Sequence, residues 1–506
     1  MGVGISKKNI KVLFVYPQFP ITFWGFKYAL KFISKKSASP PLGLLTIAAM
    51  VPQAWDKKLV DMNTSRLKDK HLRWADYVFI SGMALQRRSA REVIDRCKEI
   101  GVKTVAGGPL FTTEQKDFAD VDYLVLGEAE NIFPQFTEDI IQGSVQHIYH
   151  SDGHPDITKT PIPLWTIISK KKYGLMSIQY SRGCPFNCEF CDITNLNGHI
   201  PRTKTKEQII RELDALYDWG WRDAVFFVDD NFIGNKRKLK NEILPAIGQW
   251  MEEKRYPFTF STQLSVDLAD DDELMQLMIK AGFQAVFVGI ESPNEASLDE
   301  CAKHQNVGRD LINSVKKIQQ YGFEVQGGFI LGFDNDPESI FVRLTEFIQS
   351  TGIITAMVGL LNAVKGTRLY NRLEAENRLV KKTSGDNTDF SLNFIPKMDL
   401  HTLVQGYKKV LYTIYAPHYY YERVRTFMRE FEPPKLRPIH FRFMHIKAFF
   451  KSIWYLGFIG REKLHYWRLF FWSLRKRPNL FPSAVTFAIQ GYHFRRMFVE
   501  HAKKIH

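Results

Sequence analysis

Three closely spaced cysteines carry the strongest chemical signal in this sequence. Cys184, Cys188 and Cys191 follow the spacing CxxxCxxC, and three thiolates on one short loop can hold three corners of a [4Fe–4S] cluster. The fourth iron of such a cluster would lack a protein ligand and would stay open to a small molecule. The alternative is zinc, which needs a fourth ligand such as His199 or Cys301. The motif therefore predicts a metal centre, and its surroundings must decide which one.

The cysteines follow the first of six short apolar runs that alternate with helical patterns. Such alternation predicts a parallel sheet, and six units exceed a small doubly wound domain and fit a partial (β/α)6 barrel. Barrels of this kind place their chemistry at the C-terminal ends of the strands, which favours the iron–sulfur cluster over zinc. Thr205 and Gln208 have the spacing of a capping box at the start of one of the helices. The predicted strands span residues 175–180, 224–228, 259–262, 285–290, 327–331 and 356–360.

The first 150 residues show a second α/β pattern of Rossmann type. Glycine and proline follow its predicted strands, at the edge where open parallel sheets bind their ligands. The fingerprint GxGxxG is missing, which argues against a dinucleotide. We expect an N-terminal module (1–150), a linker (151–170), the barrel (171–382) and a mainly helical C-terminal region (383–506). The predicted strands of the module span residues 11–16, 58–61, 77–81, 104–106 and 123–126.

The cysteine motif, with Phe190 directly before the third cysteine, is similar to the signature of radical S-adenosylmethionine (SAM) enzymes. The sequence resembles that family from about residue 178 to 370. The resemblance implies that SAM chelates the open iron, and that an electron donor such as flavodoxin or ferredoxin reduces the cluster. Reduction would cleave SAM to methionine and a 5′-deoxyadenosyl radical, which abstracts a hydrogen atom from the substrate.

The same resemblance implies a set of SAM-contacting positions at the ends of the barrel strands. For the polar residues after the second strand, helix N-capping is an equally good interpretation. The glycines of the fifth strand would lie near adenine, although glycines before a turn are commonly structural. Phe190 would wall the adenine or simply pack. The implied positions are Phe190, Asp229, Asp230, Asn231, Ser261, Gln263, Glu291, Gly327 and Gly328.

The N-terminal module resembles the cobalamin-binding domain of the cobalamin-dependent radical SAM subclass. The motif DxHxxG, which supplies a histidine to cobalt in many such domains, is missing, because residues 18–23 read QFPITF. Either cobalamin binds without a protein histidine on cobalt, or the module serves only as a scaffold. The positions that match the landmarks of the domain are Ser81, Gly82, Gly107, Gly108, Gly127 and Glu128.

The combination of motifs resembles hopanoid C-2 methylases and their relatives over most of the chain. This resemblance implies a SAM-dependent C-methyltransferase that acts on an unactivated carbon of a lipid or a similar hydrophobic substrate. A second interpretation is a radical SAM enzyme that modifies a lipid without methyl transfer, by C–C coupling, ring formation or rearrangement. A third is a metal-bearing RNA-binding protein, which we consider the least favoured because RNA-modifying relatives usually carry a second cysteine triplet. The sequence has no Ser/His/Asp set and no HExxH motif.

The net charge of +15 is concentrated at the C-terminus. Residues 435–506 contain fifteen lysines and arginines, two acidic residues and seventeen aromatic residues. The simple interpretation is a helical subdomain with a solvated basic face. The alternative is a peripheral contact with an anionic membrane, because aromatic and basic side chains suit the headgroup region. Such a contact could bring the mouth of the barrel to a lipid substrate.

With 45% hydrophobic and 24% charged residues, the composition excludes disordered and low-complexity proteins. Five cysteines in 506 residues do not make a secreted disulfide scaffold. Cys97 and Cys301 are expected to be buried apolar side chains. No stretch of about 20 uncharged apolar residues is present, so we predict no membrane span and a cytoplasmic location, with possible peripheral contact at the inner membrane face.

Overall fold

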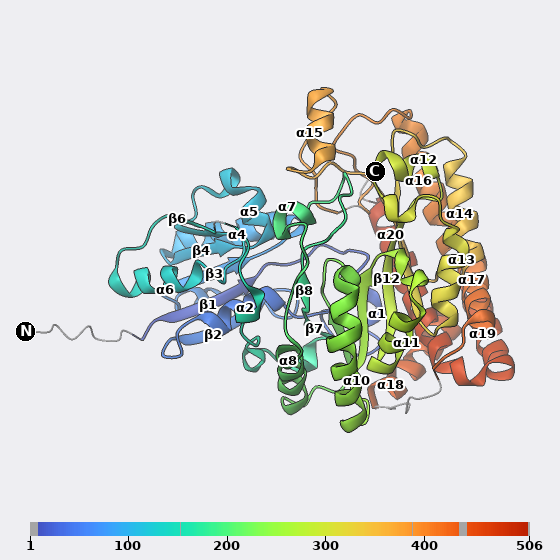
Figure 1. Ribbon diagram of the computed structural model, residues 1–506, viewed down its shortest axis with the longest axis horizontal. Coiled ribbons are helices and arrows are strands. Elements are labelled where there is room, and N and C mark those ends of the chain that lie inside the picture. Colours follow the sequence, from blue (N-terminus) through green and yellow to red (C-terminus); the bar gives the residue numbers. More distant parts are fainter. Residues whose placement is uncertain (1–8, 152, 387, 435–442, 504–506) are drawn as a thin grey trace, which may run out of the picture.

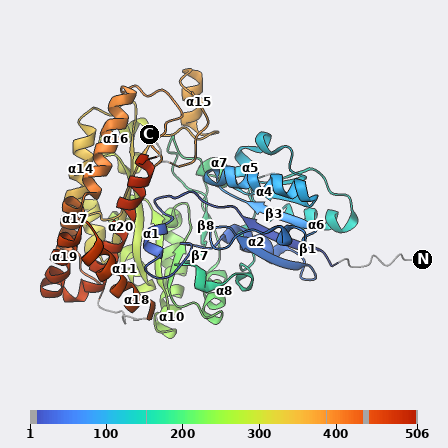
Figure 2. The ribbon, with the colours of Figure 1, turned by 180° about the vertical axis from the view of Figure 1, so that it is seen from behind.

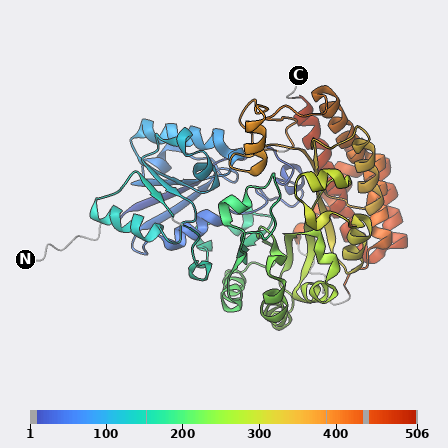
Figure 3. The same ribbon diagram turned by 45° about the horizontal axis from the view of Figure 1, so that its top comes forward.

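The computed structural model describes residues 9–151, 153–386, 388–434 and 443–503. An N-terminal α/β module, a central barrel and a set of C-terminal helices lie side by side along the long axis (Figures 1 and 3). Each α/β part is built on a parallel six-stranded sheet. The predicted α/β architecture is therefore confirmed.

The first sheet has the strand order β2-β1-β3-β4-β5-β6. The order reverses between β1 and β3, which is where open α/β sheets bind ligands at their carboxyl edge. The sixth strand, β6, was not predicted. The strands are β1 Lys11–Tyr16, β2 Asp56–Asp61, β3 Tyr77–Ser81, β4 Lys103–Gly107, β5 Tyr123–Leu126 and β6 Ile148–His150. The helices are α1 Lys27–Leu30, α2 Leu42–Met50, α3 Asp69–Leu72, α4 Arg87–Ile100, α5 Pro109–Thr113 and α6 Phe133–Gln142.

The second sheet has the order β14-β13-β12-β11-β10-β7, so consecutive strands are neighbours as in a barrel that does not close. All six predicted strands are present. They are β7 Met176–Ile178, β10 Ala224–Phe227, β11 Thr259–Leu264, β12 Phe283–Glu291, β13 Glu324–Leu331 and β14 Ala356–Leu360. The helices are α7 Ile193–Asn197, α8 Lys206–Asp218, α9 Lys236–Lys238, α10 Leu244–Glu253, α11 Asp272–Ala281, α12 Glu295–Glu300, α13 Leu311–Gln320, α14 Ile340–Thr351 and α15 Arg368–Ala375.

The open edge strand β14 is covered by the C-terminal helix α16 (Leu400–Tyr415). The hydroxyl of Tyr407 donates to the carbonyl of Val358 at 3.0 Å, and that of Tyr415 to Ala356 at 2.6 Å. These bonds satisfy edge carbonyls that would otherwise offer a template for another strand. The C-terminal region is therefore part of the barrel wall.

The remaining C-terminal helices pack on α16 and on one another. They are α17 Pro417–Glu430, α18 Phe443–Ser452, α19 Lys463–Lys476 and α20 Phe481–Lys503, with a π-helical segment at Ile453–Ile459. Residues 435–442 and 504–506, which belong to the basic segment counted above, lie outside the described residues. Among the described helices, none is both long and apolar enough to cross a membrane.

Candidate active site

The three cysteines lie within a short hairpin, on the loop between its first strand and α7. The hairpin pairs β8 (Ser181–Arg182) with β9 (Arg202–Thr203). All three thiols are half-buried, and burial raises the pKa of Cys184 and that of Cys191, the latter to about 12. Among the described residues, no group of three His, Cys, Asp or Glu side chains is gathered tightly enough to hold a single metal ion.

Contacts from two other segments hold the cysteine loop in place. The N–H of Glu189 donates to the carbonyl of Cys301 at 2.8 Å. The Glu189 carboxylate accepts two bonds from Arg372 of α15, at 2.7 and 3.0 Å. The carbonyl of Asn187 accepts from Arg368 at 2.6 Å. The loop is therefore positioned by tertiary contacts on both sides.

The two cysteines outside the motif are both buried, as predicted. Cys97 is fully buried in α4, and burial raises the pKa of its thiol to about 12. The Cys301 thiol is buried and donates to the carbonyl of Leu298, while its own carbonyl supports the cysteine loop. Both thiols behave as small apolar side chains.

The polar residues after β10 brace the cysteine loop. Asp229 is fully buried and accepts from the hydroxyl of Ser181 at 2.6 Å, and burial raises the pKa of its carboxyl to about 7. Asp230 accepts from the N–H of Gly183 at 2.8 Å. Asn231 donates to the hydroxyl of Ser265 at 3.1 Å and does not cap the following turn. The N-cap interpretation of these residues is therefore not what the structure shows, and a SAM contact stays a prediction.

Glu291 and a lysine form a buried ion pair at the end of β12. The ammonium of Lys303 lies 2.8 Å from the Glu291 carboxylate, and both side chains are about nine-tenths buried. Burial alone would lower the pKa of Lys303, but the charge of Glu291 and the nearby Cys188 and Cys191 outweigh it, and the pKa is raised. A permanent positive charge therefore faces the cysteine loop.

Two polar side chains beside Lys303 have atoms that no protein group satisfies. The Gln305 amide N–H lies 3.9 Å from the Cys188 sulfur, and its oxygen is buried without a partner. Asn306 is 1% exposed, and its side-chain oxygen is also unpartnered. Buried acceptors of this kind indicate a ligand or an ordered water. Sequence reasoning missed Lys303 and Gln305 because no motif marks the segment between α12 and α13.

Ser261 and Gln263 lie on the same face of β11, both half-buried. The Gln263 amide donates to the backbone carbonyl of Asp229 at 2.6 Å, so it ties β11 to the end of β10.

Close packing explains why β13 has glycine at positions 327 and 328. A Cβ on Gly327 would lie 2.7 Å from the Phe329 ring, and one on Gly328 would lie 2.6 Å from the Phe287 ring.

Phe190 lies beside the fifth-strand motif, as its predicted role requires. Its ring centroid is 6.3 Å from that of Phe333, the second residue after β13, in a tilted arrangement. Phe190 is half-buried against the core of the barrel. Packing accounts for this position, and a contact with adenine stays a prediction.

The predicted corrinoid loops come together at the carboxyl edge of the first sheet. A Cβ on Gly107 would lie 2.6 Å from the carbonyl oxygen of Val125, and one on Gly108 would lie 2.5 Å from the hydroxyl of Ser81. The carbonyl of Gly82 accepts from the N–H of Leu110 at 3.0 Å. The strand ends themselves therefore require the glycines, whatever lies beyond this edge.

Gly127 and Glu128 follow β5 and face the barrel. The Glu128 carboxylate is shared by Arg182 at 2.6 Å, Arg202 at 2.6 Å and His154 at 2.8 Å. Burial would raise the pKa of Glu128, but the two guanidinium groups hold it below its usual range. Glu128 thus joins the edge of the first sheet to the hairpin that carries the cysteine loop, and any contact with a corrinoid stays a prediction.

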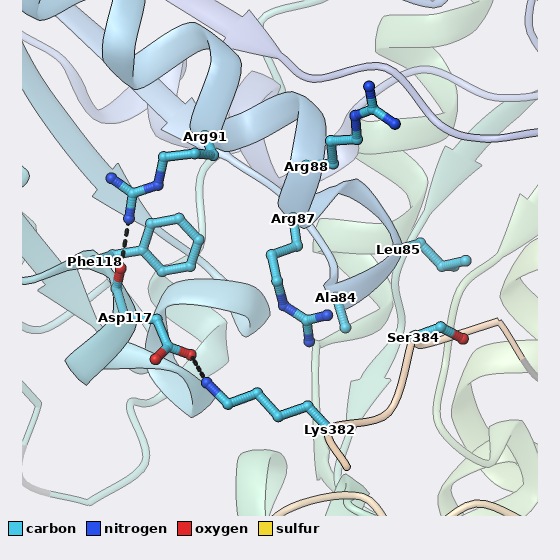
Figure 4. A pocket seen from close by; sticks show the side chains of 9 residues that line it. All are labelled: Ala84, Leu85, Arg87, Arg88, Arg91, Asp117, Phe118, Lys382 and Ser384. Carbon is cyan, nitrogen blue, oxygen red and sulfur yellow. Dashed lines mark hydrogen bonds and ion pairs between the residues drawn. The ribbon is translucent and has the colours of Figure 1, made fainter. Parts of the chain in front are cut away.

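A pocket of about 510 Å³ opens beside the same edge (Figure 4). Its cations are already paired: Arg91 with Asp120 at 2.7 Å and Lys382 with Asp117 at 2.6 Å. The pocket is therefore not an obvious anion site. Its lining residues are Ala84, Leu85, Arg87, Arg88, Arg91, Asp117, Phe118, Lys382 and Ser384.

Comparison with known proteins agrees with this arrangement. Residues 33–137 match the B12 binding domain, residues 178–348 match the Radical SAM superfamily, and residues 367–506 match a domain of unknown function (DUF4070). An uncharacterized methyltransferase of Synechocystis is 40% identical over 490 residues, 96% of this chain and 91% of the relative. The hopanoid C-2 methylase of Rhodopseudomonas palustris is 33% identical over 482 residues, 92% of this chain and 90% of the relative.

Solved structures show the same fold. TsrM from Kitasatospora setae, a radical SAM methyltransferase with cobalamin and a [4Fe–4S] cluster bound, gives a TM-score of 0.61 at 14% identity and covers 98% of this chain and 100% of its own. OxsB, a cobalamin-dependent radical SAM enzyme, gives 0.60 at 14% identity, with 98% and 80% covered.

Fold and motif define a radical SAM enzyme with an N-terminal B12-binding domain. The chain belongs to the cobalamin-dependent radical SAM family that contains the two relatives above. Its cofactors are a [4Fe–4S] cluster, SAM and cobalamin. The residues present fit a cluster, because three half-buried thiols share one loop and the buried Lys303 ammonium faces them.

Proposed function

We propose that this enzyme transfers a methyl group to an unactivated carbon of a hydrophobic lipid, as the name of its hopanoid C-2 methylase relative suggests. The observation that carries the proposal is the similarity to that relative over 92% of the chain, which includes both cofactor domains and the C-terminal region. When bound, the cluster and SAM supply a 5′-deoxyadenosyl radical, and cobalamin supplies a transferable methyl group. Such chemistry suits a carbon without an acidic proton.

Within this proposal, the residues of the chain bind the cofactors and orient them relative to each other. Cys184, Cys188 and Cys191 hold the cluster, and the Lys303 ammonium offsets its negative charge. Glu128 and Arg182 hold the cobalamin edge against the cluster loop, because their ion pair joins the edge of the first sheet to the β8–β9 hairpin. An external electron donor, such as a flavodoxin or ferredoxin, reduces the cluster.

Lipid analysis tests the substrate class directly. A strain that lacks the gene should lose a methylated lipid, detected by mass spectrometry, and should regain it with the wild-type gene. A Cys188→Ala gene should not restore the lipid, because a cluster with two of three anchors is poorly held. Restoration by the Cys188→Ala gene, or an unchanged lipid profile in the deletion strain, would contradict the proposal.

Dependence of the reaction on the corrinoid distinguishes methyl transfer from a radical reaction without methyl transfer. Protein reconstituted with hydroxocobalamin should retain corrinoid absorbance through gel filtration, and product formation should depend on it. Full turnover by corrinoid-free protein would instead favour coupling or rearrangement of the substrate.

We also propose that an aromatic hairpin, defined here as residues 443–476, binds an anionic membrane surface. Its π-helical segment leaves Trp454, Phe458 and Ile459 about 60% exposed. Lysines and arginines of the hairpin lie in the same stretch, Arg461 and Lys463 among the exposed ones. Aromatic side chains with basic neighbours suit a bilayer interface, and each basic residue near an anionic surface contributes about 1 kcal/mol.

The position of the aromatic hairpin determines how the enzyme would be oriented on a bilayer. In Figure 1, α18 lies at the lower end of the molecule, whereas α15, which contacts the cysteine loop, lies at the upper end, and α7 lies in the upper half. A membrane contact through the hairpin would therefore hold the enzyme at the bilayer without turning the strand ends toward it. The expectation that the mouth of the barrel faces the lipid does not fit this arrangement.

Flotation with vesicles tests the contact. Wild type should float with anionic phospholipid vesicles at low salt and less at high salt, because surface charges are screened. Trp454→Ser/Phe458→Ser should float less, and Val342→Ser, an equally exposed position on α14, should behave like wild type. Equal flotation of all three proteins, or binding to RNA in place of vesicles, would contradict a membrane role for the hairpin.

A further inference from the structure

The loop after β1 leaves the first module and reaches the barrel. Its tip is a tight turn in which the N–H of Gly25 donates to the carbonyl of Thr22 at 3.3 Å. Phe23 and Trp24 occupy the two central positions of this turn. The loop therefore presents two aromatic side chains where a related domain would carry DxHxxG.

Phe23 anchors the turn on the C-terminal helix α20. It is 1% exposed, and its ring stacks on Phe494 with a centroid distance of 4.4 Å. Its carbonyl lies 3.0 Å from Nε2 of His493, while Nδ1 of the same ring faces the N–H of Tyr28 at 3.4 Å. Burial lowers the pKa of His493 to about 4, so the ring is neutral at pH 7 and can donate through Nε2 and accept through Nδ1. Figure 2 shows α1, which follows this turn, beside α20.

Trp24 points the other way, against the inner face of the barrel. Its indole N–H donates to the sulfur of Met357 on β14 at 3.0 Å, and its ring meets Phe287 of β12 edge-on at 5.4 Å. Successive residues of a strand face opposite sides of the sheet. Val286 and Val288 are fully buried in the layer under the helices, so the half-buried Phe287 faces the barrel interior. Despite these contacts, Trp24 remains 36% exposed.

The position of Trp24 along the barrel relates it to the cluster. Phe287 lies two residues before Gly289, about 7 Å away at ~3.3 Å per residue. A Cβ on Gly289 would clash with the Glu291 carboxylate and lie 2.9 Å from the Lys303 ammonium, so the charged pair lies over Gly289, close above the Trp24 contact. Gly289 lies on the same face of β12 as Phe287, and its partner in the register on β13 is Gly328. Neither residue brings a side chain to this level. The Phe287 ring covers Gly328, where a Cβ would lie 2.6 Å from it, and the Glu291–Lys303 pair covers Gly289. The apolar contact of Trp24 and the charged pair are therefore neighbours on the inner face of the barrel.

We propose that Trp24 is a substrate-contacting residue that forms the apolar floor of the substrate site and limits how deeply a hydrophobic substrate enters the barrel. The inference rests on the proposed function and deepens it. The residue that selects the substrate comes from the B12-binding module, although the wall it completes belongs to the barrel. A fixed floor holds one carbon of the substrate at the level of the reacting groups.

The test compares Trp24→Ala and Trp24→Phe with Trp74→Ala, a tryptophan of the first module that packs under Lys58. Each protein is reconstituted with cluster and cobalamin and is given the lipid extract of the deletion strain. Trp24→Ala should cleave SAM without lipid as fast as wild type. Its yield of methylated lipid per 5′-deoxyadenosine should fall about tenfold, a ratio equivalent to ~1.4 kcal/mol, because an apolar contact with the substrate is lost.

Trp24→Phe should recover most of this coupling, and Trp74→Ala should match wild type. An unchanged yield in Trp24→Ala would overturn the inference. Loss of cofactors or of lipid-independent SAM cleavage in both Trp24 variants would also overturn it, because Trp24 would then be structural. If wild type methylates no component of the extract, the proposed function itself fails, and the inference fails with it.

Discussion

Replacing Arg182 with methionine should loosen the hairpin that carries the cysteine loop. Arg182 pairs with Glu128 at 2.6 Å and with Glu130 at 2.7 Å, and these three side chains are 15%, 10% and 7% exposed. Breaking a buried ion pair from one side is destabilising by about 3–5 kcal/mol, because a charge stays buried without its partner. Glu128 keeps Arg202, whereas Glu130 keeps only a bond from Thr160 at 2.8 Å. We therefore expect a loss of about 3 kcal/mol of stability, at the lower end of this range.

Hydrogen–deuterium exchange is the suitable assay, since the ion pair joins two domains and unfolding of the whole chain need not be two-state. A loss of about 3 kcal/mol corresponds to about a hundredfold lower protection in peptides that cover residues 181–203. The double variant Arg182→Met/Glu130→Gln should recover much of the loss, because it removes the stranded charge. A change below about threefold, which is under ~0.7 kcal/mol, or a double variant no better than the single one, would refute the reasoning.

The pH dependence supplies an independent check on the same pair. Burial would raise the pKa of Glu130, but Arg182 holds it below its usual value. A carboxyl with a depressed pKa in the folded state contributes stability above its unfolded pKa of about 4.3, and loses it as the pH falls through the folded pKa. In Arg182→Met, burial raises the pKa of Glu130, so its carboxyl is protonated already above pH 4.3. The difference between wild type and the variant should therefore be full near pH 7 and shrink as the pH falls toward 4.

Three further predictions concern other parts of the molecule. The pKa of His493 is lowered to about 4, so the folded state resists its protonation and stability should fall from about pH 6.5 toward pH 4; thermal unfolding of His493→Gln should show a flatter dependence. Gly108 has φ +88°, and a Cβ there would lie 2.5 Å from the Ser81 hydroxyl, so Gly108→Ala should lose about 1–3 kcal/mol of stability and retain less hydroxocobalamin on gel filtration. A Cβ on Gly43 in α2 would meet nothing within 4 Å, so Gly43→Ala should bind hydroxocobalamin as wild type does. Lys303→Met should lower the reduction potential of the cluster in an EPR-monitored titration, because a buried cation favours the reduced form; an unchanged potential would contradict this role.

Local patterns in the sequence identified the elements and the metal motif. All six barrel strands were predicted, because their apolar runs have the length of strands and alternate regularly with helical patterns. The capping box of Thr205 and Gln208 is confirmed by bonds of 3.0 and 3.3 Å, since both partners lie within one turn. The strand β6 was missed because three residues carry too little periodicity. The hairpin of β8 and β9 was missed because its two-residue strands show no pattern.

The sequence by itself determined the chemistry: three cysteines at a strand end, on an α/β barrel preceded by a cobalamin-type module. Only the tertiary structure decided how these parts meet. It joined Glu128 at the edge of the first sheet to Arg182 in the β8–β9 hairpin, turned Lys303 toward the cysteine loop and brought Trp24 into the barrel. The physical reason is the range of the interactions. Motifs and strand patterns arise within a few residues of one another, whereas ion pairs and aromatic contacts between distant segments depend on how whole elements pack.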